Sequence, residues 1–116
     1  MNDASLEQVH RYLFERIADG VLIIDAEGMI EAINPAAVAM LGITGEQARG
    51  KRSSMLFRNN ASLLNLLNRP GEQVLDVRLP RRRLALGMAS QLENNGKLII
   101  LQDVTEQRKL DFHRQE

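Results

Sequence analysis

Apolar residues change their spacing along the chain, and each spacing predicts a different secondary structure element. Near the N-terminus they recur every three or four residues, as on one face of a helix, at Leu6, Val9, Leu13 and Ile17. Residues 21–24 and 98–101 are continuous apolar runs, which are typical of strands buried on both faces. Residues 74–79 and 84–88 alternate, which predicts strands with one face turned outward.

Turn and cap residues mark where these elements begin and end. Residues 25–28, with Gly28 in the turn, predict a hairpin that joins the first two strands. Asn34 is placed to cap a helix whose first residue is Pro35, a position where a missing N–H costs nothing. Residues 44–70 are predicted to form short helices, because cap residues there precede brief apolar stretches.

The order of the strands follows from these patterns. Hairpins connect strand one to two, three to four and four to five, and the two continuous apolar strands belong at the centre. We therefore predict an α+β fold with a five-stranded antiparallel sheet in the order 2-1-5-4-3. Short helices cover one face of this sheet, and further helices flank it at both ends. The predicted units are residues 1–19 for the N-terminal amphipathic helix, 20–104 for the core and 105–116 for the start of the final helix.

The second face of the central strands also needs cover. The helix at residues 1–19 is the only spare amphipathic element, and it can come from the same chain or from a partner. This requirement favours a homodimer.

Composition narrows the function. A chain of 116 residues has room for one domain, and its 15 basic and 15 acidic residues cancel. The absence of cysteine excludes disulfides, thiolate metal sites and thiol nucleophiles. No clustered metal ligands, catalytic pair or phosphate loop is visible, so we expect neither a metal site nor an enzyme. No apolar run approaches the roughly 20 residues of a membrane span, and charges interrupt any signal peptide, so we expect a cytoplasmic protein.

One basic cluster stands out against this even charge. Arg81, Arg82 and Arg83 are consecutive, with Arg78 close by, at the hairpin predicted between the third and fourth strands. Such a cluster can contact nucleic acid, a nucleotide or anionic lipid, but aromatic residues do not interleave it. We interpret it as a solvated hairpin that protects a sheet edge, and we expect no nucleic-acid or membrane partner.

Several motifs occur in a fixed order along nearly the whole chain. They are residues 19–25 leading into Gly28, then Asn34-Pro35-Ala36-Ala37 with Met40-Leu41-Gly42, and finally Asp103-Val104-Thr105-Glu106. In this order the chain resembles a PAS domain, the sensory module of many bacterial signalling proteins.

The resemblance gives the last motif a role. It is similar to the Asp-x-Thr element through which such domains continue into an effector-linking helix, here from residue 105. In that family the Asp pairs with a basic residue of the next helix, which implies that Asp103 pairs with Arg108 and that Asp103, Thr105 and Arg108 relay the signal. The residues alone also allow a plainer interpretation, in which Asp103 or Thr105 simply caps the helix.

The resemblance also locates a pocket, between the sheet and the middle helices. The residues expected to face it are mostly Leu, Ile and Met, so we expect a small or filled cavity. A ligand there would be compact and largely apolar, with Ser90 or Gln102 as polar contacts. Haem-binding members use a histidine from the helical middle and photosensing flavin members use a cysteine. Residues 44–70 contain neither, so we expect no cofactor.

The sequence thus predicts a sensory or regulatory domain without catalysis of its own. We expect it to dimerise and to relay a signal through its C-terminal helix to an effector domain in the same parent chain. A histidine kinase is the preferred effector. A diguanylate cyclase, an enhancer-dependent transcription regulator and a structural dimerisation module without ligand are the alternatives.

Overall fold

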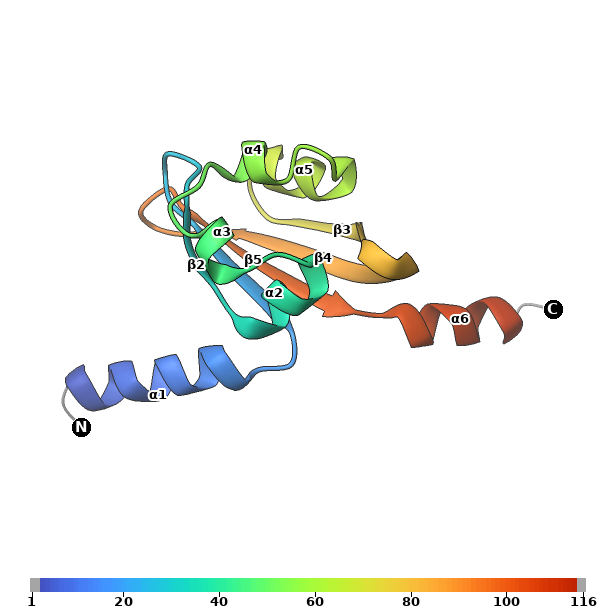
Figure 1. Cartoon of the computed structure of the whole chain (residues 1–116), viewed down its shortest axis with the longest axis horizontal. Helices are drawn as coiled ribbons and strands as arrows, with labels where there is room; N and C mark the ends of the chain where they lie inside the picture. Colours follow the sequence, from blue (N-terminus) through green and yellow to red (C-terminus); the bar gives the residue numbers. More distant parts are fainter. Residues whose placement is uncertain (1–2, 115–116) are drawn as a thin grey trace.

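An antiparallel sheet of five strands forms the centre of the chain in a computed structural model, which describes residues 3–114. The strands are ordered β2-β1-β5-β4-β3, which confirms the predicted order (Figure 1). Their bounds are β1 Gly20–Ile24, β2 Ile30–Ile33, β3 Gln73–Leu79, β4 Arg83–Gln91 and β5 Lys97–Asp103. Residues 1–2 and 115–116, which belong to the flanking helices expected at 1–19 and 105–116, lie outside the described residues.

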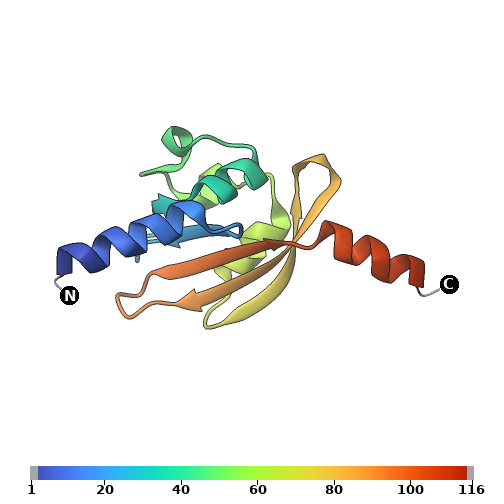
Figure 2. The same cartoon turned by 90° about the horizontal axis from the view of Figure 1, so that it is seen from below.

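Short helices cover one face of the sheet. The helices are α1 Asp3–Arg16, α2 Pro35–Leu41, α3 Gly45–Ala48, α4 Ser53–Leu56, α5 Ala61–Asn68 and α6 Thr105–Arg114. Helices α2 to α5 lie together on one side of the sheet, whereas α1 and α6 extend away from it toward opposite ends of the molecule (Figures 1 and 2). The predicted α+β fold with flanking helices is therefore confirmed.

The core lies between the sheet and these short helices. Strands β1 and β5 are neighbours, and Leu22 is paired with Ile99 at their centre. Both side chains are fully buried, and so are Leu63 and Leu66, which α5 contributes from above the sheet. The two continuous apolar strands thus occupy the centre of the sheet, where each has a neighbouring strand on both sides.

Small residues of β4 let α5 approach the sheet closely. Ala85, Gly87 and Ala89 alternate along β4 on the face that the helices cover, and all three are buried. A Cβ atom on Gly87 would lie 2.7 Å from Leu66 Cδ2 and 2.7 Å from Val77 Cγ2. The space between α5 and this part of the sheet is therefore filled with side chains.

The opposite side of the sheet, here called the outer face, carries larger apolar residues. They are partly exposed, and they include Leu84, Leu86, Met88, Leu98 and Ile100. Within this chain α1 does not bury its apolar residues on them: α1 packs beside α2 and leaves its own stripe exposed. Its exposed apolar residues are Leu6, Val9, Tyr12 and Leu13, and Ile17 just beyond the helix is also exposed. The N-terminal helix was expected to cover this face either within the same chain or from a partner. The first of these two expectations is therefore wrong.

The hairpin between β3 and β4 contains an uncommon turn. Its two central residues, Arg81 and Arg82, both have positive φ angles, 64° and 60°, and the Arg83 N–H donates to the Pro80 carbonyl. Two such residues in succession define a type I′ turn, which usually contains Asn and Gly. Residues with a Cβ atom adopt this conformation at a cost of about 1–2 kcal/mol each.

The close contact at Gly87 leads to the first prediction. Gly87→Ala would place a methyl group against Leu66 and Val77, so we expect a loss of about 1–3 kcal/mol in the free energy of unfolding. Urea denaturation followed by circular dichroism measures this change. Gly45→Ala is the matched control, because Gly45 has no neighbouring atom within 4 Å of the added methyl group. Equal stability of the two variants would contradict the packing described here.

Candidate functional site

The junction between β5 and α6, here called the exit joint, is a network of hydrogen bonds around Thr105. Thr105 is only 5% exposed, and its Oγ1 accepts from the Leu84 N–H at 2.9 Å. The same hydroxyl donates to Asp103 Oδ1 at 2.6 Å, and the Thr105 N–H donates to that oxygen at 3.0 Å. Asp103 therefore binds the N–H of the first residue of α6 from a position two residues earlier, and Thr105 ties the helix to β4.

Asp103 also forms an ion pair, with Arg83 at the start of β4. The Arg83 Nε lies 2.7 Å from Asp103 Oδ2. This hydrogen bond, helped by those from Thr105, lowers the pKa of Asp103 from 3.8 to about 2 despite an opposing effect of burial. The same pair raises the pKa of the Arg83 guanidinium. The carboxylate is thus charged in the folded protein at neutral pH.

The partner expected for Asp103 was Arg108, and the structure differs. Arg108, on the first turns of α6, instead forms a two-pronged ion pair with Asp76 of the edge strand β3. Its Nη2 lies 2.8 Å from Asp76 Oδ1 and its Nη1 lies 3.0 Å from Oδ2. The resemblance implied a basic partner for Asp103, and in this structure that partner is Arg83 of the preceding strand β4.

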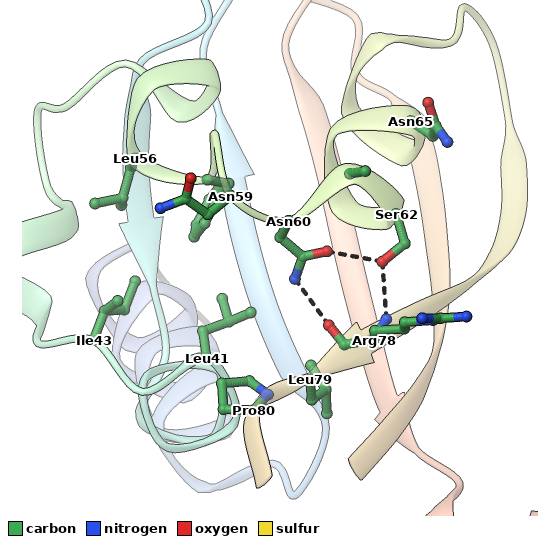
Figure 3. A pocket seen from close by; sticks show the side chains of 12 residues that line it. Leu41, Ile43, Leu56, Asn59, Asn60, Ser62, Asn65, Arg78, Leu79 and Pro80 are labelled. Atoms are coloured by element: carbon green, nitrogen blue, oxygen red, sulfur yellow. Dashed lines mark hydrogen bonds between the residues drawn. The ribbon is translucent and has the colours of Figure 1, made fainter. Parts of the chain in front are cut away.

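A cleft of about 710 Å³ opens at the edge of the sheet, between the end of α2, helices α4 and α5, and the end of β3 (Figure 3). One wall is apolar and is formed by Leu41, Ile43, Leu56, Phe57, Leu79 and Pro80. The polar wall, on the side of α5 and β3, carries Asn60, Ser62, Asn65 and Arg78, whereas Asn59 lies beside Leu56 (Figure 3). The cleft can therefore hold a small molecule with an apolar body and a polar group at one side.

The polar wall of the cleft is bonded to the backbone of β3. Asn60 Nδ2 donates to the Arg78 carbonyl at 2.8 Å, and the Arg78 N–H donates to Ser62 Oγ at 2.9 Å (Figure 3). Asn60 Oδ1 also accepts from the Leu63 N–H and from Ser62 Oγ, so it caps α5. These two side chains occupy the edge of β3 where another strand would otherwise pair.

Ser90 and Gln102, the polar contacts expected in a pocket, are not near this cleft. In the sheet Ser90 pairs with Leu98 and Gln102 pairs with Leu86, both on the outer face. Their neighbours Ala89 and Leu101 are buried toward the helices, and successive side chains of a strand point to opposite faces. The expectation that either residue contacts a ligand between sheet and helices is therefore wrong.

Asn34 does more than the predicted capping. Its Oδ1 accepts from the Ala37 N–H, which is the cap of α2, and also from the Val21 N–H of β1. Its Nδ2 donates to the Phe14 carbonyl in α1 at 3.1 Å and to the Asp19 carbonyl at 2.9 Å. Asn34 is fully buried, so this one amide fixes the end of α1 against the core.

The other turn and cap residues have the expected geometry. Pro35 is the first residue of α2, and Gly28 adopts a positive φ of 83° in the turn between β1 and β2. Only glycine takes that conformation without strain, so its role there is conformational.

The arginine cluster divides between two places. Arg83 belongs to the exit joint, whereas Arg81 and Arg82 form the exposed tip of the hairpin. The backbone of Arg78 is bonded to Asn60 and Ser62. At this point of β3 it is therefore Asn60 and Ser62, and not the arginine side chains, that occupy the edge of the sheet.

Two classes of feature are absent from residues 3–114. No group of three His, Cys, Asp or Glu residues in the described part of the chain could hold a metal ion. None of the described helices has both the length and the apolar character needed to cross a membrane.

The lowered pKa of Asp103 leads to the second prediction. Since the folded-state pKa is near 2 and the ordinary value is 3.8, the ionised form stabilises the fold above about pH 4, and this contribution is lost as the pH falls toward 2. Asp103→Asn should therefore show a flatter decline of stability between pH 4 and 2, by up to about 1 kcal/mol after solvent screening. Urea denaturation at several pH values measures it, with Glu93→Gln in the β4–β5 turn as control. Parallel curves for the wild type and Asp103→Asn would refute the role given to this carboxylate.

The chain is similar to parts of proteins named as histidine kinases. It is 30% identical over 109 residues to the signal transduction histidine-protein kinase AtoS of Escherichia coli, covering 84% of this chain and 18% of that protein. It is 29% identical over 101 residues to the cell-division control histidine kinase PdhS of Brucella ovis, covering 87% of this chain and 8% of that protein. The chain thus spans less than a fifth of the length of either relative.

The fold agrees with these similarities. A domain of a sensory box sensor histidine kinase/response regulator from Geobacter sulfurreducens superposes with a TM-score of 0.63 at 25% identity, covering 88% of this chain and 97% of that chain. Residues 8–76 match the family model described as PAS domain. Together with the strand order and the motifs that form its turns, caps and exit joint, this match shows that the chain belongs to the PAS domain family.

Proposed function

We propose that this chain is the sensory domain of a larger cytoplasmic signalling protein, and that the effector in the same parent chain is a histidine kinase. The relatives named above support the choice of effector, because both are named histidine kinases. The chain matches only a short part of each, so the rest of such a protein can hold the effector. The domain contributes no catalytic step, requires no cofactor, and binds neither nucleic acid nor membrane. Its role is to change the position of α6 in response to a signal.

The exit joint is the observation that carries this proposal. Asp103 and Thr105 connect the last strand, the start of β4 and the first turn of α6 through hydrogen bonds of 2.6–3.0 Å. A small shift of β4 against β5 therefore moves the beginning of α6 directly. A helix passes such a shift along its length, which is a common way to bias an effector between two states.

The signal enters at the cleft beside β3. Its apolar wall suits a compact hydrophobic molecule, and the exposed side-chain amide of Asn59, beside Leu56, is available to a polar group (Figure 3). The ligand class that fits is a small amphiphile, because the polar residues that line the cleft, Arg78 among them, provide hydrogen-bond donors and acceptors beside an apolar wall.

The domain acts as a homodimer. Its α1 carries a row of exposed apolar side chains, and its outer sheet face carries partly exposed Leu, Met and Ile residues. Two apolar surfaces of this kind are seldom both left in water. The α1 stripe of one copy therefore packs with the partner copy, either with its α1 or with its outer face.

Dimerisation gives the third prediction. Leu13→Glu places a charge within the α1 stripe, where Leu13 is 57% exposed in the single chain. We expect the variant to keep its fold but to shift to a monomer in light scattering at concentrations where the wild type is a dimer, because burying an unpaired carboxylate is costly. Arg11→Glu, also on α1 but outside the stripe, is the matched control. A monomeric wild type at high concentration would refute the dimer.

The relay gives the fourth prediction, and it tests the proposed function. Asp103→Ala in the intact parent protein removes the carboxylate that binds both Thr105 and Arg83. We expect autophosphorylation of the parent kinase to become unresponsive to its stimulus, because the exit joint no longer couples the sheet to α6.

The control is Glu93→Gln in the exposed β4–β5 turn, far along the sheet from α6 (Figure 1). An Asp103→Ala parent that responds to the stimulus as the wild type does would remove the basis for the relay. A parent that carries no kinase domain would overturn the choice of effector.

A further inference from the structure

The edge strand β3 contacts both the cleft and the exit helix. At Arg78 its backbone is bonded to Asn60 and Ser62 in the polar wall of the cleft. Two residues earlier, on the same strand, Asp76 holds Arg108 of α6 with distances of 2.8 and 3.0 Å. The two contacts are therefore separated by a single residue, Val77, which is fully buried in the core.

Helix α6 is consequently attached to the sheet at two points. The first is the exit joint, where Thr105 bonds to Leu84 on β4. The second, about one turn further along the helix, is the pair of Arg108 with Asp76 on β3. A helix attached to the sheet at one point can pivot about that point, whereas a second attachment to a different strand fixes its direction. The second attachment thus determines the angle at which α6 leaves the domain.

The two attachments differ in strength. Thr105 is buried, so breaking its hydrogen bonds would expose or leave unsatisfied several polar groups. The side chains of Arg108 and Asp76 are 44% and 51% exposed. Loss of an exposed ion pair changes a conformational equilibrium by only about twofold to fivefold. Small changes at β3 are therefore enough to open or close the contact between Asp76 and Arg108.

We propose that the Asp76 and Arg108 pair is a latch that sets the angle of α6, and that β3 transmits a change at the cleft to this latch. The latch concerns the domain alone, whereas its coupling to the cleft rests on the proposed sensory function. A molecule that displaces Asn60 or Ser62 from the edge of β3 would move Arg78, and with it Asp76, because both belong to one rigid strand. Helix α6 would then be released or retained.

The absence of cysteine from the chain allows a clean test. Spin labels are placed at Glu31→Cys on β2 and Lys109→Cys on α6, both exposed positions, and the labelled protein is diluted with unlabelled protein so that only distances within a chain are measured. Pulsed electron paramagnetic resonance then gives the distribution of positions of α6 relative to the sheet. All variants carry the same two labels.

We expect a narrow distribution of distances between the two labels in the labelled domain without further changes, and a broader one in Asp76→Asn. The population of displaced α6 should rise by about twofold to threefold in this variant. Arg108→Gln should behave in the same way. The double variant Asp76→Arg with Arg108→Asp should restore the narrow distribution, because it rebuilds the ion pair with its charges exchanged. If the single variants acted by damaging the fold, the double variant would not restore it. Glu72→Gln, an exposed acid just before β3, is the control. A distribution in Asp76→Asn equal to that of the control would overturn the latch.

Ser62→Ala tests the transmission through β3. It removes the acceptor of the Arg78 N–H and leaves Asn60 Oδ1 in place to cap α5. We expect the distribution of α6 to move toward that of Asp76→Asn, whereas Ser54→Ala on α4 should leave it unchanged. No effect of Ser62→Ala would overturn transmission through β3. These outcomes are independent of the parent kinase, so a failed signalling test beside a working latch would count against the proposed function only.

Discussion

The buried amide of Asn34 holds the ends of several elements in one place. It accepts from β1 and α2 and donates to the last turn of α1 and to the segment that follows it. A fully buried amide that lost these partners would leave unsatisfied donors and acceptors, at a cost of about 1–3 kcal/mol each. The position of α1 therefore depends on this side chain more than on its own apolar stripe, which is exposed. The sheet, the first short helix and the N-terminal helix form one unit through it.

The arrangement of the sheet was predictable because it depends on features that are local or repeated. Two runs of apolar residues, at 21–24 and 98–101, had to lie at the centre, and hairpins left only one order for the remaining strands. Asn34 was likewise identifiable as a cap, since the N–H that it accepts belongs to a residue three positions later. Its other bonds reach residues 13 to 20 positions away, and no spacing in the sequence indicates them.

The site was less predictable because the inner face of β4 is marked by size and not by polarity. Ala85, Gly87 and Ala89 face the helices, where Leu66 leaves room only for small residues, while Leu84, Leu86 and Met88 face outward. A pattern of apolar and polar positions does not distinguish these faces, so Ser90 was assigned to the wrong one. On β5 residues 98–101 are all apolar, so the pattern does not show which way Gln102 points either. The ion pairs of Asp103 and Asp76 join residues 20 and 32 positions apart, and which basic residue pairs with which acid is decided by the packing of the strands.

The strengths of these contacts suggest how a rigid core can coexist with a movable helix. Contacts around Asn34 and Leu66 are buried, and breaking them costs as much as a sizeable part of the stability of a small domain. The contacts that direct α6 lie progressively closer to water: Thr105 is 5% exposed, the Asp103 side chain 22% and the Asp76 side chain 51%. Since the energy of an ion pair falls as it is exposed to solvent, the helix is held firmly at its first residue and loosely one turn later. Under the proposed mechanism, a binding event too weak to deform the core is therefore sufficient to change the direction of α6.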